Sequence, residues 1–335
     1  MIEGHGDDIH LYNGKIIYNF SSNVYYKGCP PELLTEIASL THTIQNYPSP
    51  AAKELSDAAS KKFDLSNDYF LFTNGATEAF YLIAQIFTEG KAAIVSPTFS
   101  EYEDACKIHG LDYDLIDKED LIASEYELVF ICNPNNPDGS VIASEKLVSL
   151  IKETPSTTFI VDEAYIEFTN EIESLAPLVK RLDNLIVVRS LTKTFAIPGL
   201  RLGYVIASSH SIEKLLSVKM PWSVNALAIT AGLQLFESYE KWQFNVEELL
   251  AETNAFIQAL STIGWLQVKP TRTSYFLAKL DRGFASVLKE YLVNEHGILI
   301  RDATNFKLLE GEYIRLATQS QEANTALIKA LKSWR

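Results

Sequence analysis

The sequence predicts an α/β fold in which helices wrap a mixed, mainly parallel sheet, with a smaller α+β domain after it. Short apolar runs alternate with helical patterns along much of the chain, which is the rhythm of βα units. Most of these runs are apolar throughout, as expected of strands that are covered on both faces. From about Asn225 the pattern changes to two long helices and then to further strands. The chain has 335 residues, of which 47% are hydrophobic, and is long enough for two domains of unequal size.

The candidate strands are short apolar, β-branched or aromatic runs. In the large domain they lie at residues 69–72, 92–95, 128–131, 159–161, 185–188 and 204–206. Helical patterns lie between several of them, as at residues 78–87 and 144–151. In the small domain the strands are expected at residues 274–280, 298–301 and 313–317, before a final helix.

The order of predicted strands and helices divides the chain into three segments. Residues 1–30 hold polar turns and few periodic apolar positions, so we expect an arm that packs on the small domain or on a partner subunit. Residues 31–225 form the large domain, and residues 226–335 form the small C-terminal domain.

Composition excludes several classes of function. The chain carries 43 acidic and 29 basic side chains, a formal net charge of -14, so we expect no general affinity for nucleic acid or for membrane surfaces. No signal peptide and no run long enough to span a bilayer is visible, so a cytoplasmic enzyme is expected. The three cysteines and six histidines show no metal-ligand spacing, and no metal is expected.

Two turns that follow candidate strands carry residues suited to ligand binding. The first contains Gly75, Ala76 and Thr77 and opens a helix, where free backbone N–H groups and the helix dipole can hold a phosphate. Many strand-to-helix turns contain glycine for structural reasons alone. The second turn, residues 133–139, contains Asn136 between two prolines, and an ordinary tight turn explains it equally well.

A carboxylate interrupts the end of the apolar strand at residues 159–161. Asp162 is costly to bury unless it meets a cation or a strong donor, and Tyr165 follows three residues later. The cationic ring nitrogen of a ligand would satisfy it. A helix cap or a salt bridge in the core would do so as well.

The segment after residues 185–188 combines two hydroxyls, a lysine and an arginine. Lys193 can form an imine with an aldehyde, and desolvation near other cations would lower its pKa so that it can also move protons. Arg201 can bind a phosphate in a forked geometry, together with Ser190 and Thr192. A solvated loop with two basic residues is the alternative, and the Pro-Gly-Leu-Arg-x-Gly continuation disfavours it.

These four motifs, in this order, resemble those of class I/II aminotransferases of fold type I, over nearly the whole chain. The resemblance implies a seven-stranded, mainly parallel sheet and the cofactor pyridoxal 5'-phosphate. In that family the lysine matching Lys193 holds the cofactor and moves the proton at the substrate carbon, while the residues matching Asp162 and Tyr165 contact the ring nitrogen and the ring hydroxyl. The cofactor-binding residues that it implies are Gly75, Ala76, Thr77, Phe99, Asn136, Asp162, Tyr165, Ser190, Thr192, Lys193, Arg201 and Tyr47.

The same resemblance implies a homodimer with shared active sites. Tyr47, in Gln45-Asn46-Tyr47-Pro48, resembles the tyrosine that family members offer to the phosphate in the neighbouring subunit. Phe99 matches the residue that stacks on the cofactor ring.

Within the family the chain resembles two groups that act on small phosphorylated amines. The ends of the chain resemble threonine-phosphate decarboxylases, which serve cobalamin side-chain synthesis, and histidinol-phosphate aminotransferases are the alternative. Arg315 matches the residue that binds the substrate carboxylate, and Arg301 would meet the substrate phosphate. The implied substrate-binding residues are Arg315, Arg301, Asn136, Asn23 and His5. For His5 the favoured alternative is a surface residue of the arm.

Some positions depart from the family pattern. Gln319 stands where the decarboxylases often have a basic residue, and Asp138 replaces a more usual threonine. Two other classes of protein would need motifs that this sequence does not show. A non-catalytic ligand-sensing domain would need a DNA-binding segment, and none is visible. A nucleotide-binding dehydrogenase would need a Gly-x-Gly-x-x-Gly turn after an early strand, which is also missing.

Overall fold

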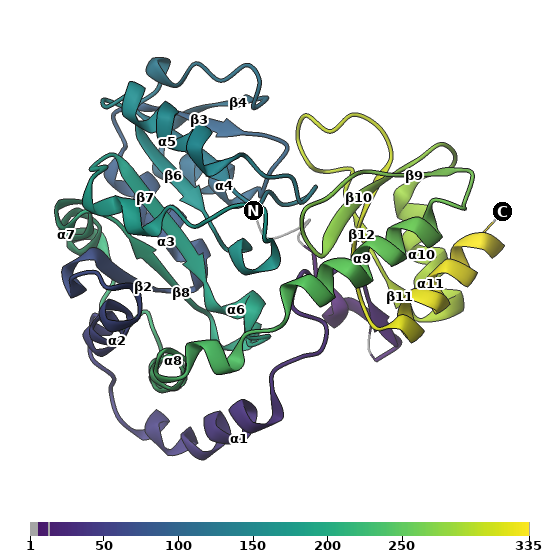
Figure 1. Cartoon of the computed structure of the whole chain (residues 1–335), viewed down its shortest axis with the longest axis horizontal. Coiled ribbons are helices and arrows are strands. Elements are labelled where there is room, and N and C mark those ends of the chain that lie inside the picture. Colours follow the sequence, from purple (N-terminus) through teal and green to yellow (C-terminus); the bar gives the residue numbers. More distant parts are fainter. Residues whose placement is uncertain (1–5, 13, 335) are drawn as a thin grey trace.

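A computed structural model describes residues 6–12 and 14–334 of the chain as two bodies of unequal size (Figure 1). The larger body holds a seven-stranded sheet in the order β2-β8-β7-β6-β5-β3-β4. β8 runs antiparallel to both of its neighbours, and the other neighbouring pairs are parallel. The predicted α/β fold with a mainly parallel seven-stranded sheet is confirmed. The strands are β2 (Phe70–Asn74), β3 (Lys91–Val95), β4 (Asp112–Ile116), β5 (Leu128–Cys132), β6 (Thr158–Asp162), β7 (Leu185–Ser190) and β8 (Leu202–Ile206).

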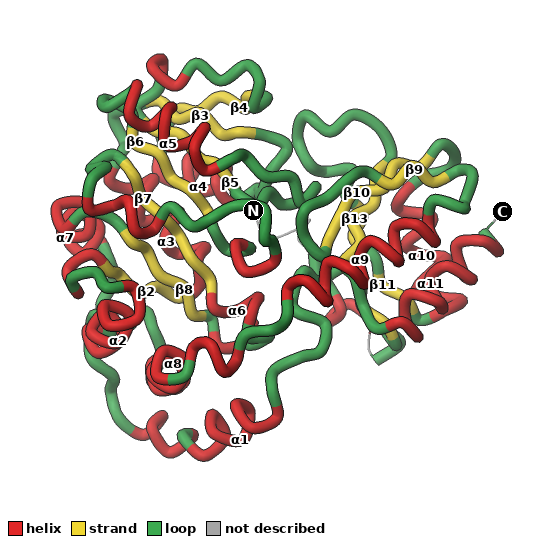
Figure 2. Tube along the Cα trace, viewed as in Figure 1, coloured by secondary structure: helices red, strands yellow, loops and turns green. Residues whose placement is uncertain are grey.

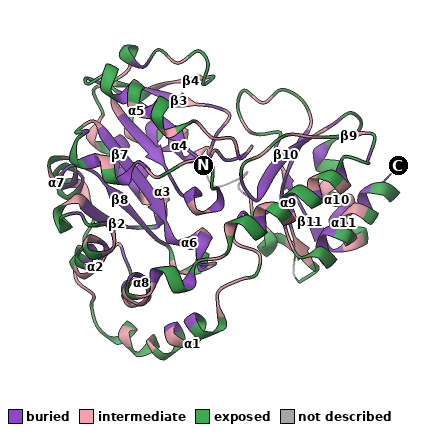
Figure 3. Cartoon of the chain, viewed as in Figure 1, coloured by how far each residue is buried: buried purple, intermediate pink, exposed green. Residues whose placement is uncertain are grey.

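Helices cover both faces of this sheet, which explains why its central strands are apolar throughout. Successive residues of β5 alternate between two hydrophobic clusters, Val129 facing one and Phe130 the other. On the Val129 side pack α1 (Pro31–Ser39), α2 (Lys53–Phe63), α5 (Ser144–Glu153) and α8 (Ala226–Glu237). On the Phe130 side pack α3 (Gly75–Ile86), α4 (Glu101–His109) and α7 (Ser209–Val218). Figure 3 shows the buried strands between helices whose outer faces are exposed.

The smaller body contains an antiparallel sheet in the order β12-β13-β10-β9 (Figure 2). Three helices bury one face of it in a separate hydrophobic cluster. The strands are β9 (Leu266–Val268), β10 (Tyr275–Leu280), β12 (Arg301–Asp302) and β13 (Tyr313–Ala317), and the helices are α9 (Val246–Leu260), α10 (Ala285–His296) and α11 (Gln321–Ser333).

The N-terminal segment adds a short strand to the smaller body. β1 (Tyr18–Asn19) pairs in parallel with β11 (Ile298–Leu299). The run expected as one strand at residues 298–301 is therefore two strands, because β11 pairs with the arm while β12 pairs with β13.

The expected domain boundary at residue 225 stays a prediction, and the packing favours a later one. α8 and the following residues up to Trp242 contribute to the hydrophobic core of the large sheet. Among the described residues no helix is long and apolar enough to cross a membrane, and none of their His, Cys, Asp and Glu side chains cluster as metal ligands.

Candidate active site

The polar motifs meet at one edge of the large sheet because β2, β5, β6 and β7 run in the same direction. A cavity of about 340 Å³ opens there. The sequence-predicted residues that line it are Asn23, Ala76, Thr77, Phe99, Asn136, Asp162, Tyr165, Ser190, Thr192, Lys193, Arg201 and Arg315. The structure therefore brings together residues that are far apart in the sequence.

One side of the cavity is suited to a phosphate. The N-terminus of α3 places Ala76 and Thr77 in the wall, where their backbone N–H groups begin the helix. The hydroxyls of Ser190 and Thr192 lie 2.8 Å apart, and both residues also line the cavity. With Arg201 beside them, these groups offer the donors and the positive charge that a phosphate requires.

Two glycines allow this side to close tightly. Gly75 has a positive φ of 74°, and a side chain there would overlap the Arg201 guanidinium. At Gly203 on β8, a Cβ atom would lie 2.6 Å from the backbone carbon of Gly75. Gly75 is thus next to the cavity but does not line it.

Asp162 ends β6 and is buried in the cavity wall. Its Oδ1 accepts a hydrogen bond from the backbone N–H of Ala164 at 2.9 Å, and its Oδ2 accepts one from the Tyr102 hydroxyl at 2.5 Å. Burial raises the pKa of Asp162 to about 6, although both hydrogen bonds oppose the shift. A cation in the cavity would stabilise the ionised form of this buried carboxylate. The protonated nitrogen of a cofactor ring would be such a cation.

Lys193 belongs to the short helix α6 (Leu191–Thr194), which follows β7 directly. Burial lowers the pKa of Lys193 to about 8, and the positive charges of Arg315 and Arg201 act in the same direction. About a tenth of its amine is therefore neutral at pH 7, far more than for an exposed lysine, and the neutral form is the one that attacks an aldehyde.

Tyr165 and Asn136 complete the wall between the two bodies. Burial raises the pKa of Tyr165 to about 12, so its hydroxyl stays protonated, and the side-chain amide of Asn23 lies 3.5 Å from it. The amide oxygen of Asn136 accepts a hydrogen bond from Arg315 Nη1 at 2.5 Å. Asn136 thus links the large sheet to the smaller body.

Two arginines stand side by side at the small-domain wall. Arg301 on β12 pairs directly across from Arg315 on β13. Arg315 Nη2 also donates to the backbone oxygen of Ser21 at 2.6 Å, while its Nε, like Oδ1 of Asn23, is buried without a hydrogen-bond partner among the described residues. Burial and Arg315 lower the pKa of Arg301 to about 10, and burial lowers that of Arg315. Both arginines line a neighbouring cavity of about 70 Å³, which also reaches Asn136 and Phe99.

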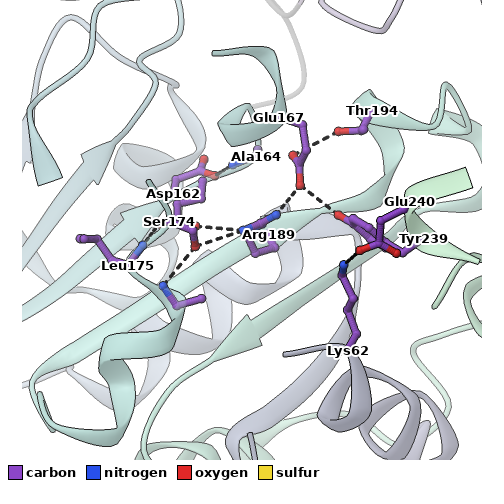
Figure 4. A network of polar contacts seen from close by, with 12 residues as sticks. Lys62, Asp162, Ala164, Glu167, Ser174, Leu175, Arg189, Thr194, Tyr239 and Glu240 are labelled. Carbon is purple, nitrogen blue, oxygen red and sulfur yellow. Dashed lines mark hydrogen bonds and ion pairs between the residues drawn. The ribbon is translucent and has the colours of Figure 1, made fainter. Parts of the chain in front are cut away.

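A buried polar network lies behind the cavity wall (Figure 4). Arg189 on β7 forms ion pairs with Glu163, at 3.1 Å, and with Glu167. Glu167 also accepts hydrogen bonds from Thr194 at 3.2 Å and from Tyr239 at 2.9 Å. Arg189, Glu163 and Thr194 are each the sequence neighbour of a residue in the cavity wall, so the network joins the segments that carry Ser190, Asp162 and Lys193.

Tyr47, a predicted site residue, lies apart from the cavity. Tyr47 is 90% exposed, and its ring centroid is 5.8 Å from that of Trp222. His5 lies outside the described residues.

Sequence reasoning missed several residues of this site. Arg189 is a charged residue that follows an apolar run, and that was the only signal for it. Tyr102 stands between Glu101 and Glu103, and the sequence held no signal for its burial. Ser21 contributes a backbone carbonyl, for which a sequence holds no signal. Asp7 of the arm also lines the cavity.

The chain is similar to known proteins over most of its length. The family model for aminotransferase class I and II matches residues 15–331. A protein of Caldanaerobacter subterraneus, provisionally named a threonine-phosphate decarboxylase, is 36% identical over 98% of this chain and 93% of its own. A histidinol-phosphate aminotransferase of the same organism is 31% identical over 94% of this chain and 92% of its own.

A solved structure is also similar over almost its whole length. The crystal structure of L-threonine-O-3-phosphate decarboxylase from Porphyromonas gingivalis has a TM-score of 0.92 and 34% identity, covering 95% of this chain and 99% of that one. The chain therefore belongs to the class I and II aminotransferase family, whose enzymes use pyridoxal 5'-phosphate.

Proposed function

We propose that this protein is a pyridoxal 5'-phosphate enzyme that decarboxylates L-threonine O-3-phosphate. The observation that carries the proposal is the pair Arg301 and Arg315, two buried cations on neighbouring strands beside the cavity. Phosphothreonine has two anionic groups, a carboxylate and a phosphate, which such a pair can bind separately. The similarity to threonine-phosphate decarboxylases in sequence and structure supports the same substrate.

The cavity wall supplies the groups that the cofactor needs. Ala76, Thr77, Ser190, Thr192 and Arg201 would hold its phosphate. Asp162 would face its ring nitrogen, Tyr165 and Asn136 its ring hydroxyl, and Phe99 its ring face, with Lys193 as its covalent anchor. When bound, the cofactor supplies a conjugated ring that accepts the electron pair released when a bond at the substrate α-carbon breaks.

The side chains of the protein would orient the substrate and move its proton. Arg315 would bind the substrate carboxylate and Arg301 its phosphate, with Asn23, Asn136 and, by resemblance, His5 near them. The lowered pKa of Lys193, about 8, lets its amine hold or release a proton near neutral pH. After carbon dioxide leaves, the ammonium of Lys193 would return a proton to the substrate α-carbon.

Histidinol-phosphate transamination is the second candidate, because a histidinol-phosphate aminotransferase is 31% identical over nearly the whole chain. Histidinol phosphate has no carboxylate. Arg315 would then act chiefly on the second substrate, a dicarboxylic amino or keto acid.

Product analysis separates the two functions. Enzyme loaded with pyridoxal phosphate is incubated with phosphothreonine alone, and in parallel with histidinol phosphate and 2-oxoglutarate. We expect carbon dioxide in the first reaction without any keto acid. Turnover of histidinol phosphate that requires the keto acid, with no carbon dioxide from phosphothreonine, would contradict the decarboxylase assignment.

A substitution tests the role of Arg301. Arg301→Met should lower kcat/KM for phosphothreonine about 100-fold, because a charge-assisted contact to the phosphate is lost. The control is a substrate without phosphate: for L-threonine the same variant should change kcat/KM little. Equal losses with both substrates would show that Arg301 does not recognise the phosphate.

We further propose a homodimer with shared active sites in the cytoplasm. Ile44, Tyr47, Met220 and Trp222 are large, exposed apolar residues. The indole N–H of Trp222 donates to the Pro48 carbonyl at 3.1 Å, which brings the two segments together on one surface. Such a patch is suited to a second copy of the chain. In that dimer Tyr47 would reach the cofactor phosphate of the neighbouring subunit.

A further inference from the structure

We propose that Tyr102 is a positioning residue, which orients the Asp162 carboxylate toward the ring nitrogen of the cofactor and holds Phe99 beside the ring. The inference rests on the cofactor site proposed above. It concerns a residue that neither the motifs nor the family resemblance singled out.

The geometry places Tyr102 directly behind Asp162. Tyr102 lies on α4, is 0% exposed, and donates its hydroxyl proton to Asp162 Oδ2 at 2.5 Å. The other oxygen, Oδ1, is held by the Ala164 backbone N–H. The Cys132 thiol lies 4.0 Å from Oδ2 but only 3.2 Å from the Pro134 carbonyl, so Tyr102 makes the short hydrogen bond to this oxygen. A short hydrogen bond to each oxygen fixes the plane of the carboxylate, since a carboxylate held at one oxygen alone can rotate about its own bond.

Aromatic packing around the Tyr102 ring fixes the position of its hydroxyl. The Tyr102 ring stacks on Phe130, with centroids 5.3 Å apart, and meets Phe80 edge-on at 4.7 Å. Its third aromatic neighbour is Phe99, in a T-shaped contact at 5.8 Å. Tyr102 therefore contacts both Asp162, which is expected at the nitrogen of the cofactor ring, and Phe99, which is expected on the face of that ring.

The hydroxyl also keeps Asp162 ionised. Burial raises the pKa of Asp162 to about 6, and the hydrogen bond from Tyr102 is the largest of the effects that oppose this rise. The other groups facing the carboxylate are Lys193, which lowers its pKa, Glu163, which raises it, and the buried thiol of Cys132, whose Sγ lies 4.0 Å from Oδ2. Without the hydroxyl, the carboxylate would be protonated at a higher pH and would bind a protonated ring nitrogen less well.

Cofactor binding by the apoprotein tests the proposal without measuring turnover. The affinity for pyridoxal phosphate is measured by absorbance across pH 5 to 9 for wild type, Tyr102→Phe and Tyr126→Phe. Tyr126 is the matched control, because it donates the same kind of bond, at 2.9 Å, to the edge-strand carboxylate of Asp114 and does not line the cavity.

We expect Tyr102→Phe to bind the cofactor about tenfold to 100-fold more weakly at neutral pH, as for other hydrogen bonds to charged groups. The acid limb of its affinity profile should move to higher pH by about one unit. Nuclear magnetic resonance of cofactor labelled with ¹⁵N should show a lower fraction of protonated ring nitrogen. Tyr126→Phe should match wild type in all three measurements.

A second variant separates the hydrogen bond from the packing. Tyr102→His keeps a ring N–H donor among the same aromatic neighbours. It should recover part of the affinity for pyridoxal phosphate that Tyr102→Phe loses. Circular dichroism checks that both variants are folded. If Tyr102→Phe and Tyr102→His then lose the same cofactor affinity, ring packing matters and the hydrogen bond does not, which overturns the proposal. A Tyr102→Phe chain that does not fold would also overturn it, because Tyr102 would then be a structural residue.

Two null results have different meanings. If Tyr102→Phe binds the cofactor as wild type does at every pH, the role of Tyr102 is wrong and the proposed cofactor site stands. If wild type itself binds no pyridoxal phosphate, the proposed function fails first.

Discussion

Lys193 acquires its chemical character from neighbours that belong to different parts of the chain. Arg201 follows it closely in the sequence, whereas Arg315 comes from the smaller body. Burial and both guanidinium groups lower the pKa of Lys193, while Asp7 and Asp162 oppose the shift. The sequence could predict a buried lysine near cations, but the contribution of Arg315 depends on tertiary structure.

The pKa of Lys193 predicts a pH dependence for the reactivity of the apoprotein. Because only the neutral amine is nucleophilic, labelling of Lys193 by formaldehyde and cyanoborohydride should rise through a midpoint near pH 8. Arg315→Met removes a positive charge that disfavours the ammonium form, so its midpoint should lie at higher pH. Mass spectrometry of the labelled peptides gives both profiles, with the exposed Lys53 as an internal control. An unchanged midpoint in Arg315→Met would contradict this account.

The site residues that the sequence predicts lie in local sequence patterns, whereas the residues that it missed depend on contacts between distant elements. Asp162, Lys193 and Arg201 lie at strand ends, where the local pattern already indicates a ligand. Tyr102 lies in the first turn of α4 between Glu101 and Glu103, and its role appears only when β6 is placed against α4. Contacts between elements distant in sequence leave no local signal.

At the scale of elements, the phosphate side of the cavity depends on a close approach of α3 to β8. Gly203→Ala would force a Cβ atom against the backbone of Gly75 and Ala76. We expect the free energy of unfolding to fall by about 1–3 kcal/mol, as for other overpacked sites, and the affinity for pyridoxal phosphate to fall with it. Urea unfolding and cofactor titration measure the two effects. Gly199→Ala is the matched control, because a Cβ atom there meets nothing within 4 Å; similar losses in both variants would refute the close-approach argument.

The network around Arg189 joins β6, β7 and α6 at the same scale. Arg189→Met leaves two carboxylates, the buried Glu163 and the partly buried Glu167, without their cation. The expected cost is about 3–5 kcal/mol of unfolding free energy, measured by urea denaturation of the cofactor-free protein. The exposed pair Arg272 and Glu171 is the control, and Arg272→Met should cost about 1 kcal/mol or less. A small effect at Arg189 would mean that one carboxylate takes up a proton at little cost.

Most of the strands were predictable because both of their faces are buried. The apolar runs at residues 128–131 and 185–188 lie within β5 and β7. β4 was missed because it is an edge strand with polar residues at Asp112 and Asp114. β9 was missed because it is short and lies at the edge of its own sheet.

At the scale of the whole molecule, the cavity lies where the arm, the large sheet and the smaller body meet. Arg315 of the smaller body donates to Ser21 of the arm and to Asn136 of the large sheet. The order of strands and the path of α8 across the large sheet could not be predicted, since local periodicity does not record which elements become neighbours.

The proposed dimer predicts that two inactive variants restore each other. If Tyr47 serves the neighbouring site, a dimer of one Tyr47→Ala chain and one Lys193→Ala chain contains one site with both residues intact. Random exchange of equal amounts makes half of the dimers mixed, so activity should return to about a quarter of wild type. Each variant alone should stay well below that value. Size-exclusion chromatography verifies the dimer, and unmixed, separately assayed samples are the control. A mixture no more active than the average of its components would show that Tyr47 acts within its own subunit or not at all.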